Sequence, residues 1–168
     1  MWSYRGQQRP DFALEPGPGQ ESVWDYPRPP ALVASSRRVL VMSGESVVAD
    51  TGRAMRVLET ASPPTYYLPP EDVDFSHLID APGSSFCEWK GRANYYALAT
   101  GGGVVAWQYR EPSATFAAIE GYLSFYPAKL LCTVDGERVQ PQPGDFYGGW
   151  ITDEIVGPFK GEPGTGHW

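Results

Sequence analysis

Apolar and polar positions alternate through the middle of the chain, and this period of two predicts β-strands. Residues 38–42 and 46–50 flank a Ser-Gly-Glu turn, so they are predicted to form a first hairpin. Residues 129–134 and 137–139 flank an Asp-Gly turn and are predicted to form a last one. Further strands are predicted over residues 54–60 and 65–68.

Residues 84–98, SSFCEWKGRANYYAL, are predicted to form a central hairpin with its turn at Lys90-Gly91. A loop over residues 80–84 precedes this hairpin, and a strand over residues 104–109 follows it, so that three consecutive strands form a meander. Alternation would place Cys87 and Trp89 on one face of the hairpin. The opposite face would then carry Phe86, Glu88 and Lys90.

Helical periodicity is confined to short stretches. Apolar residues recur at helical spacing after Ser113, a good N-cap residue, and we predict a helix over residues 113–120. Residues 122–126 fit a strand as well as a helix. Glu71-Asp72, which follows two prolines, predicts one helical turn. The predicted fold class is therefore mainly β, a small antiparallel domain with one or two short helices.

Both ends of the chain are rich in proline and glycine and carry aromatic rings without periodicity. We predict an extended N-terminal segment over residues 1–30, a β domain over residues 31–139 and a C-terminal wrap over residues 140–168. The N-terminal segment is expected to be partly disordered before Pro16, with Trp24 packed into the domain. The run 150–156 is expected to add an edge strand, in this chain or in a partner subunit, which would allow a homo-oligomer through the extensions.

Composition excludes several classes of function. The chain of 168 residues has a formal net charge of -7, which opposes binding to a phosphate backbone. Its two cysteines lie far apart without a CxxC motif, so we expect neither a zinc site nor a disulfide framework. No apolar run reaches the ~18 residues of a membrane span, and the N-terminus lacks the apolar centre of a signal peptide. We therefore expect a cytoplasmic protein without nucleic-acid or membrane partners.

Few residues of the sequence suggest a known catalytic mechanism. His77 and Cys87 are the one readable pair of base and nucleophile, although a buried structural cysteine is the commoner case. Asp72-Val73-Asp74 is the one Asp-x-Asp sequence that suggests a magnesium site, but acidic residues are expected at a helix start in any case. The glycine clusters lack the residues that follow in phosphate-binding loops.

The cations of the central hairpin suggest binding instead. Lys90 lies at a turn between aromatic strands, where Tyr95 and Trp107 can supply stacking surface for a ligand. Glu59 shares a strand face with two apolar residues, and a group of Glu59, Glu88 and Lys90 is the most economical polar site. Core packing is the more ordinary role for strand aromatics, and hairpin cations are usually solvated.

The chain resembles a bacterial domain-of-unknown-function family, number four hundred and twenty-seven. The motifs that carry the resemblance include ESVWDYPRPP, RVLETASPPTYYLPPEDV, FCEWKGRANYYAL, AAIEGYLSFYPAKL and the tail FYGGWITDEIVGPFKGEPGTGHW. The family signature [ST]-x-C-x-x-K-G-x-A-x-Y fits the stretch from Ser85 to Tyr95. This resemblance implies a β-tent fold. Many relatives of that shape bind zinc through two CxxC pairs, which this sequence lacks.

The family is sometimes labelled nucleotidyltransferase-like, a label for which the sequence offers only Asp72 and Asp74. Positions that match the family motifs, together with the stacking argument for Trp107, define six candidate ligand-binding residues. They are Glu59, Tyr66, Cys87, Lys90, Tyr95 and Trp107.

The favoured hypothesis is a protein that binds a small aromatic or anionic ligand in an aromatic-lined pocket at the central hairpin. A group-transfer enzyme that uses Cys87, or Glu59 with Lys90, is the first alternative. A structural or assembly protein whose extensions pair two chains is the second. A reactive thiol would favour the enzyme, and a dimer that needs residues 140–168 would favour assembly.

Overall fold

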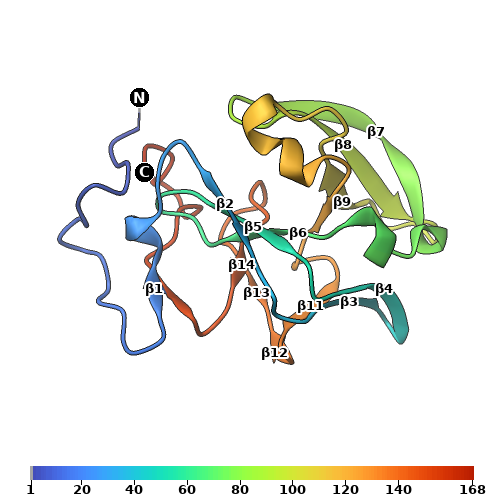
Figure 1. Cartoon of the computed structure of the whole chain (residues 1–168), viewed down its shortest axis with the longest axis horizontal. Coiled ribbons are helices and arrows are strands. Elements are labelled where there is room, and N and C mark those ends of the chain that lie inside the picture. The colour runs from blue at the N-terminus through green and yellow to red at the C-terminus, as the bar shows by residue number, and fades with distance from the viewer. Residues whose placement is uncertain (1) are drawn as a thin grey trace.

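A computed structural model describes residues 2–168 and shows a mainly β protein (Figure 1). Three larger sheets, two of four strands and one of three, have only antiparallel neighbours. Their strand orders are β10-β9-β8-β7, β12-β11-β3-β4 and β2-β5-β6. The predicted mainly β, antiparallel fold class is confirmed.

The first sheet, which we call the hairpin sheet, contains the predicted meander. Its strands are β7 (Leu78–Cys87), β8 (Gly91–Leu98), β9 (Val104–Gln108) and β10 (Leu123–Phe125). The loop predicted over residues 80–84 is wrong, because these residues lie within β7 and are accommodated by a bulge between Ala81 and Ser84.

The turn of the central hairpin comes earlier than predicted. Cys87 pairs with Gly91, so the turn consists of residues 88–90. A three-residue hairpin loop needs a residue of positive φ at its end, and Gly91 with φ 110° meets that need. Residues 88–90 therefore do not follow the alternation of the strands.

The second sheet contains both predicted outer hairpins. The second consists of β3 (Val39–Ser43), β4 (Ser46–Thr51), β11 (Leu131–Val134) and β12 (Glu137–Arg138). The third consists of β2 (Ala31–Ala34), β5 (Met55–Leu58) and β6 (Thr65–Tyr67). The largest apolar cluster joins them to the hairpin sheet through buried residues such as Val41, Phe125 and Trp150.

The helices of the described chain are all short 3-10 helices. They are η1 (Val23–Asp25), η2 (Pro70–Asp72), η3 (Phe75–His77) and η4 (Ala114–Ile119). The helical turn predicted at Glu71-Asp72 is η2. None of the described helices is long and apolar enough to cross a membrane.

The helix predicted over residues 113–120 is η4, which is kinked at Phe116. Ser113 does not cap it, because its Oγ donates to the carbonyl oxygen of Trp89 at 2.7 Å. The Ser113 amide also donates to the carbonyl oxygen of Lys90 at 2.9 Å. The start of η4 therefore holds the turn of the central hairpin in place. Residues 122–126, which fitted either structure, supply strand β10.

The two ends of the chain lie side by side (Figure 1). Strand β1 (Glu21–Ser22) pairs in parallel with β15 (Ile155–Val156), while β13 (Gln140–Pro141) pairs with β14 (Trp150–Ile151). The run 150–156 thus forms two short strands within the same chain.

Trp24 anchors the N-terminal segment. It is 1% exposed and belongs to an apolar cluster with Leu58 of the third sheet and Ile155, which confirms its predicted packing into the domain. The rings of Tyr4 and Phe12 meet its edge, with ring centroids 5.1 and 5.2 Å from that of Trp24. The division into one domain with two extensions, and disorder before Pro16, stay predictions.

Candidate functional site

A pocket of about 270 Å³ lies beside the turn of the central hairpin, and we call it the hairpin pocket. One part of its wall comes from the hairpin itself, a second from the chain between β5 and β6, and a third from the two terminal segments. The lining residues are Trp2, Val57, Glu59, Ser62, Pro63, Thr65, Cys87, Lys90, Gln142, Phe146, Tyr147, Gly148 and Lys160.

Lys90 reaches into this pocket from the turn. It is half-buried, and its Nζ lies 5.8 Å from the ring centroid of Tyr109 and 5.9 Å from that of Phe116. The predicted alternation had put Lys90 beside Glu88. Because residues 88–90 form the turn, Glu88 is instead exposed and does not line the pocket. The hairpin pocket is therefore lined by Lys90 and Glu59 but not by Glu88.

Cys87 lines the same pocket and packs against the apolar cluster of Trp107 and Tyr109. The predicted pair of Cys87 and His77 is wrong. His77 ends η3 just before the ten-residue strand β7, and Cys87 is the last residue of that strand, which separates them by ~30 Å at the usual rise per residue. The Nε2 atom of His77 lies instead 3.4 Å from a carboxylate oxygen of Asp74.

Glu59 faces the pocket but is held by a buried arginine. The Nε of Arg28 lies 3.2 Å from Oε2 of Glu59. The side chain of Arg28 is 0% exposed, and its other nitrogens donate to the carbonyl oxygens of Tyr4 and Thr60 at 2.8 and 3.0 Å. The charges of Arg28 and Glu59 therefore compensate each other.

Lys160 is the most deeply buried cation of the pocket lining, since the residue is only 4% exposed. Its Nζ lies 3.9 Å from the ring centroid of Trp2 and donates to the main-chain oxygen of Trp168 at 3.3 Å. Burial, reinforced by the nearby charge of Arg28, lowers the pKa of Lys160, while Glu59 partly opposes the shift. Across residues 2–168, neither Lys90 nor Lys160 forms an ion pair with an Asp or Glu side chain.

The remaining three sequence candidates lie outside this lining. Trp107 is 8% exposed, donates from Nε1 to the hydroxyl of Tyr67 at 3.2 Å, and packs directly beneath Gly148. Tyr95 lines a neighbouring hollow of about 440 Å³, and its hydroxyl oxygen lies 2.5 Å from Oγ of Ser85. Tyr66 is buried and stacks on Trp150 in the main core.

The structure thus brings Glu59, Cys87 and Lys90 together and places Trp107 behind their pocket. Sequence reasoning missed Trp2 and Lys160, which reach the pocket from the two extensions. The available signal was the presence of rings and a lysine in segments otherwise made of proline, glycine and polar residues.

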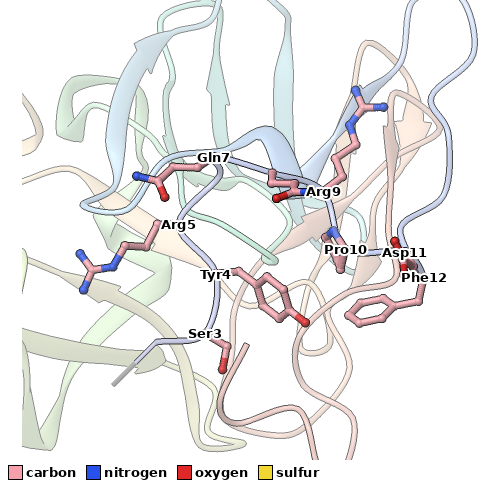
Figure 2. Close-up of a pocket in the computed structure, with 9 residues that line it drawn as sticks. Ser3, Tyr4, Arg5, Gln7, Arg9, Pro10, Asp11 and Phe12 are labelled. Atoms are coloured by element: carbon pink, nitrogen blue, oxygen red, sulfur yellow. The ribbon is translucent and has the colours of Figure 1, made fainter.

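A larger hollow of about 500 Å³ is lined by the N-terminal segment alone (Figure 2). Figure 2 shows Arg5 and Gln7 pointing away from Tyr4 and Phe12. Arg9, the other arginine of the lining, pairs with Glu15 and Asp25, which lie outside this hollow. Its two arginines therefore do not converge on a shared centre, and we do not consider it a candidate site.

The Asp-x-Asp sequence has a structural role. Asp72 accepts hydrogen bonds from the Thr51 hydroxyl at 2.7 Å and from Arg53 at 3.1 Å, and these contacts, the first above all, lower the pKa of its carboxyl. Asp74 accepts from the amide of Ser76 at the start of η3. Within residues 2–168, no three His, Cys, Asp or Glu side chains gather into a group that suits a metal ion.

A comparison with protein families matches residues 31–140 to the model of a family described as a domain of unknown function (DUF427), which carries a nucleotidyltransferase-like label. No curated protein matches the chain. The matched region contains Glu59, Cys87 and Lys90, whereas Trp2 and Lys160 lie outside it.

Proposed function

Because this chain belongs to the DUF427 family, whose description assigns no activity, we propose a function from the hairpin pocket alone: the protein binds a small ligand that combines an anionic group with a flat ring. Lys90 and Lys160 bind the anionic group. The rings of Trp2, Phe146 and Tyr147 contact the flat part of the ligand.

One observation carries this proposal: two of the three lysines of the chain line the same small pocket, in a protein whose net charge is -7. Lysine ammonium groups are normally solvated at the surface, and burying one without a counter-charge is unfavourable. The one carboxylate of the lining, Glu59, is already compensated by Arg28. A bound anion supplies the ion-pair partner that neither lysine has among the Asp and Glu side chains of residues 2–168.

The proposed contact with a flat ring rests on the exposed aromatic side chains that line the pocket. The Phe146 side chain lines it although the residue is 79% exposed, which is unusual for a large apolar residue. Trp2 and Tyr147 are half-buried in the same lining. A flat ring between these side chains would remove apolar surface from water and fix the orientation of the ligand.

Isothermal titration calorimetry with benzoate tests the proposal, with neutral benzyl alcohol as the uncharged analogue. A hydrogen bond to a charged group contributes ~1.5–3 kcal/mol, so Lys90→Gln and Lys160→Gln should each weaken benzoate binding about tenfold to a hundredfold. Lys129→Gln is the matched control, since this third lysine is exposed and outside the pocket lining. Equal affinity for the alcohol, or unchanged benzoate affinity in both pocket variants, would contradict the proposal.

Group transfer through Cys87 is the second candidate, favoured by the position of its thiol in the same lining as Lys90. We rank it below binding, because Glu59, the one carboxylate of the lining, is engaged by Arg28. A cytoplasmic location without nucleic-acid or membrane partners is part of the proposal, and the net charge of -7 supports the absence of a nucleic-acid partner.

A further inference from the structure

We propose that the ligand of the hairpin pocket is an anionic aldehyde or ketone and that Lys160 forms an imine with its carbonyl carbon. The inference rests on the proposed function and narrows it, because it names the reactive group of the ligand and the residue that meets it. It also adds a covalent step to what would otherwise be simple binding.

The surroundings of Lys160 are those of a nucleophilic amine. A lysine attacks a carbonyl only in its neutral form, which is favoured when the side chain is desolvated or lies next to another cation. Lys160 meets both conditions, since it is 4% exposed and shares the Trp2 ring with a second cation: Nζ of Lys160 lies 3.9 Å, and Cζ of Arg28 4.3 Å, from the ring centroid. The resulting decrease in its pKa agrees with this geometry.

The other two lysines lack this combination. Lys129 is exposed to solvent and lies outside the lining of the hairpin pocket. Lys90 lines the pocket, but at the turn it is only half-buried and therefore less desolvated than Lys160. With a ligand that has no carbonyl group, both lysines face the anionic group. With an anionic aldehyde or ketone, Lys90 binds the anionic group and the neutral form of Lys160 attacks the carbonyl carbon.

The reaction balances without an oxidant or a reductant. The lone pair of Nζ forms a bond to the carbonyl carbon, and the π electron pair moves to the oxygen, which takes up a proton. The hydroxyl group of this carbinolamine then leaves as water while the nitrogen loses its remaining proton, so that amine and carbonyl give imine and one water molecule.

Reductive trapping tests the inference on the full chain. The probe is para-carboxybenzaldehyde, which has a ring, a carboxylate and an aldehyde, with sodium cyanoborohydride added to reduce any imine. Peptide mass spectrometry then gives the modified fraction at each of the three lysines. We expect modification of Lys160 to exceed that of Lys129 at least tenfold. Modification of Lys129 to the same extent, or none at Lys160, would overturn the inference.

A matched probe separates this inference from the proposed function. The alcohol para-(hydroxymethyl)benzoate keeps the ring and the carboxylate but has no carbonyl group. If calorimetry shows that it binds while the aldehyde does not modify Lys160, the imine is refuted and the binding function stands. If the alcohol does not bind and no modification occurs, both proposals fail. Modification of Lys160 that the alcohol suppresses, and that Lys160→Arg abolishes, supports both.

Discussion

Replacement of Glu59 by glutamine tests the electrostatic design of the pocket most directly. Glu59→Gln keeps the shape of the side chain and an acceptor oxygen, but it removes the negative charge that faces Arg28. The guanidinium would remain buried, because the Arg28 side chain is 0% exposed and its remaining nitrogens are held by two carbonyl oxygens. A buried charge would then lack a compensating charge.

The expected loss of stability follows from the burial of the pair. Removing one partner of a fully buried ion pair costs ~3–5 kcal/mol. Glu59 is 23% exposed in its side chain, and glutamine retains one hydrogen-bond acceptor, so we expect a smaller decrease of about 2 kcal/mol in the free energy of unfolding. Because Glu59 also favours the charged form of Lys160, the same substitution should lower the pKa of Lys160 further.

Urea unfolding followed by tryptophan fluorescence measures the effect. The matched control is Asp50→Asn, which removes the charge of the exposed Arg38–Asp50 pair, whose side chains are 69% and 43% exposed. Solvent screens such pairs, so the control should not change the stability measurably. An unchanged unfolding free energy for Glu59→Gln, or the same decrease in both variants, would refute the reasoning.

Three further outcomes follow from the same contacts. Gly148→Ala should lower the free energy of unfolding by ~1–3 kcal/mol in the same urea assay, because a Cβ at this position would overlap the indole of Trp107. Gly52→Ala is the control and should leave stability unchanged, since there is open space around its Cβ. Iodoacetamide at about pH 8 should modify Cys87 but not Cys132 in the native protein, because burial raises the pKa of the Cys132 thiol to about 12. A mass spectrum with both thiols modified would contradict this prediction. Asp72→Asn should make stability fall less steeply below about pH 4. The pKa of the Asp72 carboxyl is lowered in the folded state, so its ionised form stabilises the protein above the usual carboxyl pKa, and this contribution is lost as the pH falls through the lowered pKa. Acid denaturation curves of the variant and the wild type that coincide would exclude this contribution.

Local patterns predicted most of the sheet structure. Both outer hairpins and the central meander were readable, because alternation and glycine turns act over a few residues. The segment over residues 80–84 was misread as a loop because Pro82 and Gly83 usually end a strand. In the structure they lie on the edge strand β7, where proline does not interrupt a ladder and Gly83, with φ 96°, fits the bulge.

The site was only half predictable for a different reason. Glu59, Cys87 and Lys90 lie close to turns and in patterned strands, so their neighbourhood was partly visible in the sequence. The ion pair of Arg28 with Glu59 joins residues 31 positions apart, and Lys160 approaches Trp2 across almost the whole chain. Such contacts depend on how the aperiodic ends dock, which no local pattern indicates.

The hairpin pocket is built from two parts of the chain, and ligand binding would therefore depend on how these parts dock. Lys90, Glu59 and Cys87 belong to the region that matches the family, whereas Trp2 and Lys160 come from the extensions on either side. A ligand that contacts both parts binds fully only while the extensions are docked, and it stabilises that docked state by mass action. If the protein binds the proposed ligand, the aperiodic ends, which are held by Trp24 and by the pairing of β1 with β15, take part in binding as well as in covering the core.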